Sequence, residues 1–269
     1  MMQLDFYKYD GAGNDFVVLD IRQHDPKLST ATIAHLCHRR FGVGADGLMT
    51  LGNAPSPYDF EMKYYNSDGR LGSMCGNGGR CIAAFAYSLG LGHIDGQTGR
   101  HALDFLAYDG SHHAEIISAD QQCGKLVVEL GMRDVEKSSV RQCLDGCFLD
   151  TGSPHYVQRV HDLDHFDVVG EGRRLRNNAE QFPEGTNVDF VEELADGRLS
   201  IRTYERGVED ETWACGTGVT ACALVTGNGD IKTRGGDFKV TYNDDGDVFT
   251  NVQLTGPVSF NFAGTIKIL

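Results

Sequence analysis

Two segments of this chain carry the same local pattern, and this repeat constrains the fold more than any other feature. Each segment has a strand-like run, a polar loop, a Cys-Gly-x-Gly motif and an apolar helical stretch. The strand-like runs are Phe60 to Tyr65 and Leu199 to Tyr204, and the motifs are Cys75-Gly76-Asn77-Gly78 and Cys215-Gly216-Thr217-Gly218. An internal repeat of this kind predicts two halves with similar topology.

The helical stretches that follow the two motifs are apolar on every side. They run from Cys81 to Tyr87 and from Val219 to Val225. A helix without a polar face must be buried all round, and a curved sheet wrapped around it achieves this in a small domain. We therefore predict an α+β fold of two pseudo-symmetric halves, each a curved, mostly antiparallel β-sheet or barrel wrapped around a central buried helix.

Other parts of the chain favour strands, with one further helix. Strands are expected at Leu4 to Tyr9, Phe16 to Ile21 and Leu126 to Leu130. An outer amphipathic helix is expected after an N-cap at Ser29 or Thr30. The C-terminal stretch is expected to form successive hairpins, with a break at Gly256-Pro257.

The boundary between the halves is expected where polar residues interrupt two strand-like runs, at Ser118 to Gly124. The N-terminal half would cover residues 1–118 and carry Cys75. The C-terminal half would cover residues 119–261 and carry Cys215, and a final strand at 262–269 would join the N-terminal half.

Bulk composition narrows the function classes. The formal net charge is -14, which disfavours nucleic acid and anionic membranes as partners. No run approaches the roughly 18 apolar residues of a membrane span, and the N-terminus has no leader pattern. Without a C-x-x-C pair, the eight cysteines are interpreted as free thiols and not as zinc ligands. We expect a cytoplasmic protein with a small-molecule substrate, no metal and a homodimeric assembly.

The two motifs indicate acid–base chemistry at cysteine. A cysteine directly before a helix, followed by glycines, lies at the positive end of the helix dipole, where a thiolate and a substrate carboxylate are both stabilised. A lone cysteine would more often be a packing residue. The duplication favours Cys75 and Cys215 as a functional pair that approaches one carbon from opposite faces, as inversion of a stereocentre requires.

Three further features are less specific. His155 follows Pro154 in a turn-like stretch, and it is either a surface residue or a group that sets the protonation of a cysteine. Glu205-Arg206 is either a solvated charged pair or a pair that binds an ammonium and a carboxylate group of the substrate. Gly42 to Gly47 matches G-x-G-x-x-G, but it follows a helix and precedes a strand, so we interpret it as a tight loop.

With these residues in view, the chain closely resembles the diaminopimelate epimerase family along nearly its whole length. The resemblance rests on motifs in the family's order: Gly13-Asn14-Asp15-Phe16, Arg39 to Gly47, Asn66-Ser67-Asp68-Gly69, Met74 to Cys81, Gly152-Ser153-Pro154-His155, Thr186-Asn187-Val188, Tyr204-Glu205-Arg206-Gly207 and Ala214 to Gly218. It implies cofactor-independent epimerisation of LL- to meso-diaminopimelate, a step of lysine and peptidoglycan precursor biosynthesis.

The resemblance also implies roles for individual residues. Cys75 and Cys215 would be the two bases, and His155 and Glu205 would set proton state or orientation at the reacting centre. Substrate binding is implied for Asn14, Asn66, Gly76, Asn77, Asn187, Glu205, Arg206, Gly216 and Thr217. This chain departs from the family's pattern at Ser153, where many members have asparagine, and at Gly47, where some have glutamine. The segment from Glu205 to Cys215 is one residue longer than in many members.

Two alternatives stay open at this point. A proline or hydroxyproline racemase would share the two-cysteine logic, but its substrate would leave the polar binding residues without partners. A thiol redox-regulated binding protein would instead pair Cys75 with Cys215 in a regulatory disulfide.

Overall fold

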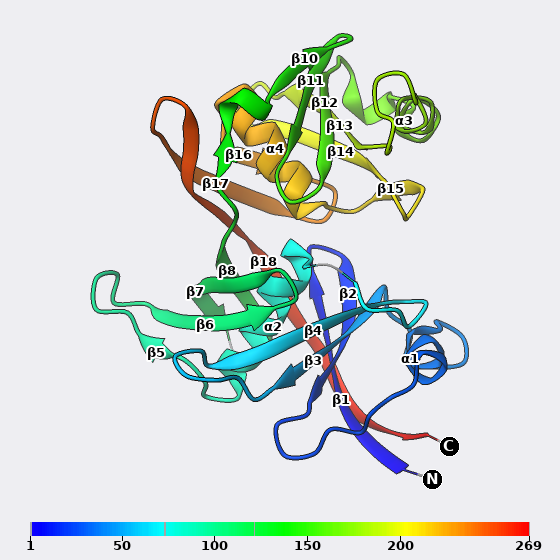
Figure 1. Ribbon diagram of the computed structural model, residues 1–269, viewed down its shortest axis with the longest axis vertical. Helices are drawn as coiled ribbons and strands as arrows, with labels where there is room; N and C mark the ends of the chain where they lie inside the picture. The colour runs from blue at the N-terminus through cyan, green and yellow to red at the C-terminus, as the bar shows by residue number, and fades with distance from the viewer. Residues whose placement is uncertain (1, 73, 121, 269) are drawn as a thin grey trace. The chain divides into compact units, whose positions relative to one another are not determined.

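The computed structural model describes residues 2–72, 74–120 and 122–268, and the chain divides into two compact units (Figure 1). Unit 1 comprises Met1–Leu130 and Pro257–Leu269, and unit 2 comprises Gly131–Gly256. The first boundary lies 12 residues after the predicted one at 118/119, because β7 (Gly110–Asp120) and β8 (Lys125–Gly131) pair as neighbouring antiparallel strands. The polar interruption between them is a hairpin turn, within which Gln121 lies outside the described residues.

Unit 1 is built on a closed barrel. Its strands, besides β7 and β8, are β1 (Met2–Gly11), β2 (Asn14–Asp20), β3 (Gly47–Gly52), β4 (Phe60–Asn66), β6 (His101–Ala107) and the C-terminal part of β18 (Val248–Ile268). They pair in the order β1, β2, β3, β4, β6, β7, β8 and β18, and β18 returns to β1. Strand pairs β2–β3 and β4–β6 are parallel, and the short β5 (His93–Ile94) adds to β6.

Two helices belong to unit 1. The outer helix α1 (Thr30–Cys37) connects the parallel strands β2 and β3, and the hydroxyl of Ser29 caps it by accepting from the Thr32 amide. The inner helix α2 (Gly76–Ser88) contacts β1, β2, β3, β4, β6 and β7 and is buried from Gly76 to Ala86. The predicted outer and buried helices are therefore both present.

Unit 2 repeats this arrangement. Its strands are β9 (Val135–Glu136), β10 (Arg141–Cys143), β11 (Gly146–Asp150), β12 (Pro154–Arg159), β13 (Asn187–Glu193), β14 (Leu199–Glu205), β15 (Asp210–Thr212), β16 (Asp230–Lys232), β17 (Asp237–Asp244) and the N-terminal part of β18. Its helices are α3 (Val168–Arg176) and α4 (Gly216–Thr226), with short 3₁₀ turns at Lys137–Ser139 and Leu163–His165.

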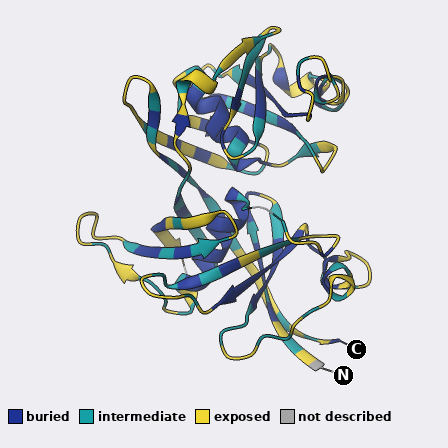
Figure 2. Cartoon of the chain, viewed as in Figure 1, coloured by how far each residue is buried: buried dark blue, intermediate teal, exposed yellow. Residues whose placement is uncertain are grey.

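The two units share one order of elements, as the repeat predicts. In each, an antiparallel strand pair leads through a helix to a parallel strand, an antiparallel strand follows, and the buried helix comes next. Figure 2 shows α2 and α4 as largely buried helices among their strands. The fold is thus α+β with two similar halves. Within the described ranges, no helix combines the length and the hydropathy that crossing a membrane requires.

The prediction of a break at Gly256-Pro257 is wrong, because both residues lie inside the 21-residue strand β18. The register with β17 ends at Thr255, and the register with β1 begins at Ser259. Pro257 therefore lies between the β17 and β1 ladders, where neither of these two strands pairs with it. One strand consequently serves the sheets of both units.

Candidate active site in each unit

Each of the two motif cysteines occupies the N-cap of its buried helix. Cys75 has φ -116 and ψ 123 before α2, and Cys215 has φ -115 and ψ 114 before α4. The carbonyl groups of both residues accept a helical hydrogen bond, from Gly79 at 2.7 Å and from Val219 at 2.8 Å. Both thiols are therefore held at the positive end of a helix dipole in the same backbone conformation.

In unit 1 the thiol of Cys75 lies beside the side chain of Asn14. The Cys75 Sγ is 3.7 Å from Asn14 Oδ1, and Asn77 donates to the same oxygen at 3.5 Å. The Asn14 amide donates to Asp46 at 2.8 Å. Because Asp46 lies on the Gly42 to Gly47 loop, that loop helps to orient the amide beside the thiol.

A chain of charged groups supports this arrangement. Arg39 bridges Asp46 and Asp15 at 2.6 and 2.7 Å, and the buried Lys8 contacts Asp15 at 2.5 Å. Burial alone would raise the pKa of Asp15, but the hydrogen bonds and charges of Arg39 and Lys8 outweigh it and lower the pKa to about 2. Asp15 is therefore ionised at neutral pH.

Arg80 is a completely buried cation in the first turns of α2. It donates to Asn77 Oδ1 at 2.9 Å and to the Gly76 carbonyl at 3.2 Å. Burial lowers its pKa to about 10, so the guanidinium stays charged at neutral pH and interacts electrostatically with Cys75. In unit 2 the position equivalent to Arg80, five residues after the motif cysteine, is Thr220. Its hydroxyl donates to the Gly216 carbonyl at 3.0 Å.

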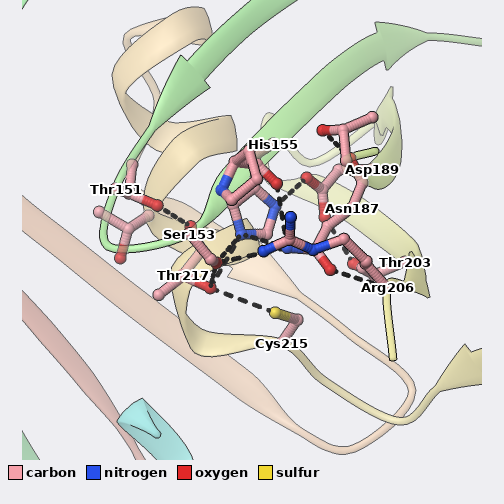
Figure 3. A network of polar contacts seen from close by, with 12 residues as sticks. Thr151, Ser153, His155, Asn187, Asp189, Thr203, Arg206, Cys215 and Thr217 are labelled. Atoms are coloured by element: carbon pink, nitrogen blue, oxygen red, sulfur yellow. Dashed lines mark hydrogen bonds and ion pairs between the residues drawn. The ribbon is translucent and has the colours of Figure 1, made fainter. Parts of the chain in front are cut away.

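In unit 2 a polar chain leads from Cys215 into the core (Figure 3). The Cys215 Sγ lies 3.4 Å from Thr217 Oγ1, which lies 2.8 Å from His155 Nε2. His155 Nδ1 lies 2.7 Å from Asp189 Oδ2, and both side chains are fully buried. The Ser153 hydroxyl is 3.0 Å from both His155 Nε2 and Thr217 Oγ1, so serine at this position joins the network.

Asn187 links this network to the loop after β14. Its amide donates to the Pro154 carbonyl at 3.0 Å, and its carbonyl accepts from the Arg206 backbone at 2.8 Å. The Arg206 side chain donates to the Glu184 carbonyl at 3.1 Å. Asn187 thus fixes the start of that loop.

Cys215 is held in its neutral form. It is 8% exposed, and burial raises its pKa well above the ordinary value, with the charges of Glu205 and Asp189 acting in the same direction. Hydrogen bonding with Thr217 and Gly218 opposes the rise. Hence Cys215 is a thiol at neutral pH.

His155 lies fully buried on β12, which excludes the surface residue among its two sequence interpretations. Pro154 is the first residue of that strand, a position that proline tolerates. Asn66 is exposed at the end of β4, and Glu205 is the last residue of β14. Cys75, Asn14 and Asn77 cluster in unit 1, as Cys215, Thr217, His155 and Asn187 do in unit 2.

Two buried charged residues were not predicted as parts of the site. Asp189 interrupts the apolar run of β13, and Arg80 lies in an otherwise apolar helix. Charged residues are almost never fully buried without partners, so a charge inside an apolar run is the signal that would have found both.

Among the described residues, Asp59, His93 and Asp104 form the one group with the spacing of metal ligands, with ligand atoms within 4.8 Å of one another. Asp59 already accepts from the Asp104 backbone at 2.8 Å, and Asp104 lies 2.8 Å from His113. Both carboxylates therefore have protein partners.

Several solved structures share the fold of this chain. A phenazine biosynthesis protein of the PhzF family from Bacillus anthracis superposes with a TM-score of 0.70 at 12% identity, covering 100% of both chains. A hydroxyproline epimerase from Agrobacterium vitis gives 0.65 at 16% identity, covering 98% of this chain and 92% of that one. At these identities the likeness concerns the fold alone.

Sequence comparison defines the family. The family model described as diaminopimelate epimerase matches residues 6–127 and 147–260. Diaminopimelate epimerase of Flavobacterium psychrophilum is 45% identical, with 97% of this chain and 99% of the relative covered. That of Chlorobaculum tepidum is 40% identical, with 96% and 99% covered. The chain belongs to the diaminopimelate epimerase family and is an isomerase.

Proposed function

We propose that this enzyme interconverts LL- and meso-diaminopimelate without a cofactor, with Cys75 and Cys215 as its two acid–base groups. The observation that carries the proposal is the matched placement of the two thiols, each at the N-cap of an equivalent buried helix with nearly the same backbone angles. Family membership supports the substrate.

In the proposed reaction one cysteine thiolate removes the α-proton and the other cysteine, as a thiol, delivers a proton to the opposite face. The C–H bond that breaks leaves its electron pair on the α-carbon, and the new C–H bond consumes that pair. Charge on the carboxylate rises in between, so donors at the helix starts stabilise the transition state. The reaction requires both helix starts to reach one substrate molecule.

The resting protonation state follows from the unequal surroundings. The buried Arg80 charge favours a thiolate at Cys75, whereas burial and two carboxylates favour a thiol at Cys215. We propose that the free enzyme holds Cys75 as the base and Cys215 as the acid. This is the state required to begin the reaction in one direction.

The remaining side chains would bind the substrate. We propose that the helix starts at Gly76, Asn77, Gly216 and Thr217 bind the reacting carboxylate through their backbone N–H groups. The distal amino-acid group would be recognised by the polar residues that the family resemblance implies, namely Asn14, Asn66, Asn187, Glu205 and Arg206.

We also propose a homodimer in a reducing compartment, the cytoplasm. All eight cysteines are free, and thiols that act as acid and base must stay reduced. On β18, Phe260 and Phe262 are 36% and 47% exposed, and a second copy packed over them would remove apolar surface from water. Sedimentation analysis tests the dimer, with Phe262→Ser expected to shift it to monomer.

The decisive experiment follows the α-proton of LL-diaminopimelate in D₂O, with L-proline as the comparison substrate. We expect deuterium incorporation and meso product from diaminopimelate only. Cys75→Ala and Cys215→Ala should each abolish inversion, whereas Cys123→Ala, which removes an exposed cysteine, should leave it unchanged. Inversion retained by either catalytic variant would refute the two-base scheme, and turnover of L-proline would favour the racemase alternative.

A further inference from the structure

The hydrogen bonds beneath Cys215 have a defined direction (Figure 3). An ionised Asp189 carboxylate can only accept, and it accepts from Thr203 at 2.7 Å and from His155 Nδ1 at 2.7 Å. His155 therefore carries its proton on Nδ1, which leaves the lone pair on Nε2 as an acceptor. The Thr217 hydroxyl lies nearest to it at 2.8 Å, ahead of the Ser153 hydroxyl at 3.0 Å and the Asn187 amide at 3.3 Å. Thr217 Oγ1 is then free to accept from the Cys215 thiol at 3.4 Å.

We propose that Asp189 is a positioning residue that fixes this tautomer of His155, so that Thr217 relays a proton between Cys215 and His155. This inference rests on the proposed function, in which Cys215 must act as a base in one of the two directions. The residues concerned come from three segments of unit 2, namely β12, β13 and the start of α4.

The relay balances without any co-reactant. The thiol proton moves to Thr217 Oγ1 as the hydroxyl proton moves to His155 Nε2, which leaves a Cys215 thiolate and an imidazolium beside the Asp189 carboxylate. The thiolate then removes the α-proton and becomes a thiol again. When Cys215 next protonates a substrate, the imidazolium proton returns along the same path to the thiolate.

The surroundings of Cys215 explain why a relay is needed. Asp189 from β13, Glu205 from β14 and the buried Cys222 on α4 interact with it electrostatically, and none is a cation. Cys75, in contrast, has the buried Arg80 charge and the non-titrating amide of Asn14 beside it. A titrating acceptor, His155, therefore accompanies Cys215, whose thiolate the surroundings disfavour.

The tautomer can be read directly, without substrate. Long-range ¹H–¹⁵N spectra of the ¹⁵N-labelled protein should show His155 protonated on Nδ1, with the signal assigned by its loss in His155→Gln. A proton on Nε2 in the unmodified protein would overturn the proposal.

Kinetics test the role of Asp189. We expect Asp189→Asn to lower kcat by at least about 100-fold with KM changed less than about threefold, because a triad aspartate that fixes a histidine tautomer has effects of this size or larger. Combining it with Thr217→Val should lower kcat no further than the more damaging single variant, since both act on one path. The relay would be contradicted if the kcat losses of the two single variants multiplied in the double variant, or if Asp189→Asn left kcat unchanged.

Alkylation separates the relay from the catalysed reaction. In a Cys75→Ala background, Thr217→Val should slow modification of Cys215 by iodoacetamide at pH 8 by about tenfold, because the hydroxyl that would pass the thiol proton to His155 is removed. Thr220→Val removes a hydroxyl from the same helix outside the relay and is expected to leave the rate unchanged. Equal rates in the two variants would refute the relay, whereas failure to turn over diaminopimelate would refute only the proposed substrate.

Discussion

The thiol of Cys75 points its sulfur at the side-chain carbonyl of Asn14, with 3.7 Å between Sγ and Oδ1. The opposite end of the same amide is held by Asp46 at 2.8 Å, and Asp46 is held in turn by Arg39 at 2.6 Å. A neutral amide fixed in this way places a dipole at the sulfur without adding a charge. A charge introduced at position 14 should therefore change how readily the Cys75 thiol ionises.

Asn14→Asp is expected to suppress the Cys75 thiolate. A carboxylate beside the sulfur disfavours the second negative charge and raises the pKa of the thiol. In a Cys215→Ala background, the pH midpoint for alkylation of Cys75, measured by peptide mass spectrometry, should rise by about one unit, so that alkylation slows by about tenfold at pH values below the midpoint. Asn53→Asp, an exposed amide elsewhere in unit 1, is the matched control. Equal rates in the two variants would show that Asn14 does not control ionisation.

Arg80→Met is also expected to raise the pKa of the Cys75 thiol, but for a different reason. Removing the buried cation withdraws the electrostatic support of the Cys75 thiolate and the hydrogen bonds to Asn77 and Gly76. Alkylation of Cys75 near neutral pH should slow by about tenfold or more. Arg80→Lys keeps the charge and should lie between Arg80→Met and the unmodified protein. A rate for Arg80→Met equal to that of the unmodified protein would exclude an electrostatic role.

The repeat was sufficient to predict the central architecture. Two apolar helices behind Cys75 and Cys215 require enclosing sheets, and both helices begin at the residue after the cysteine. Local sequence did not reveal α3, because its buried face is small, with Val168, Gly172 and Leu175 set among charged residues. Tertiary position also overrode local signals at Gly256-Pro257 and at Pro154-His155, where proline lies within a strand.

The partners of the site residues could not be predicted for a related reason. Asp189 lies 34 positions after His155, and their contact exists because β12 and β13 pair in parallel with His155 beside Asn187. Residues two apart on a strand share a face, so this register brings Asp189 to the histidine. The pairing of distant strands is a property of the fold that the local pattern does not contain.

Stability at acidic pH should depend on Asp15. Its pKa is about 2 in the folded protein and about 3.9 in an unfolded chain. The carboxylate therefore stabilises the fold above about pH 4, and this contribution of about 2 kcal/mol is lost as the pH falls toward 2. Urea unfolding at pH 5 and at pH 2.5 should show a smaller loss in Asp15→Asn than in the unmodified protein, whereas the exposed Asp68→Asn should behave like the unmodified protein. Parallel losses in all three would contradict this assignment.

The second glycine of the Cys-Gly-x-Gly motif should respond differently to alanine in the two halves. A Cβ at Gly218 would lie 2.3 Å from Asp189 Oδ1, whereas a Cβ at Gly78 would lie 3.1 Å from Met49 Sδ and 3.6 Å from Met62 Cε. The carboxylate is fixed by its hydrogen bonds to Thr203 and His155, but a methionine side chain can move aside.

Gly218→Ala is therefore expected to lower the free energy of unfolding by about 1 to 3 kcal/mol, as overpacking does, and to lower kcat by about 100-fold through displacement of Asp189 and His155. Gly78→Ala should change the free energy of unfolding by less than about 1 kcal/mol, because alanine's better helix propensity offsets the mild crowding. Urea unfolding and epimerisation assays of the two variants make the comparison. Equal effects on kcat would show that the carboxylate behind Gly218 is no more important than the thioether behind Gly78, and Asp189 would then have no special part in the reaction.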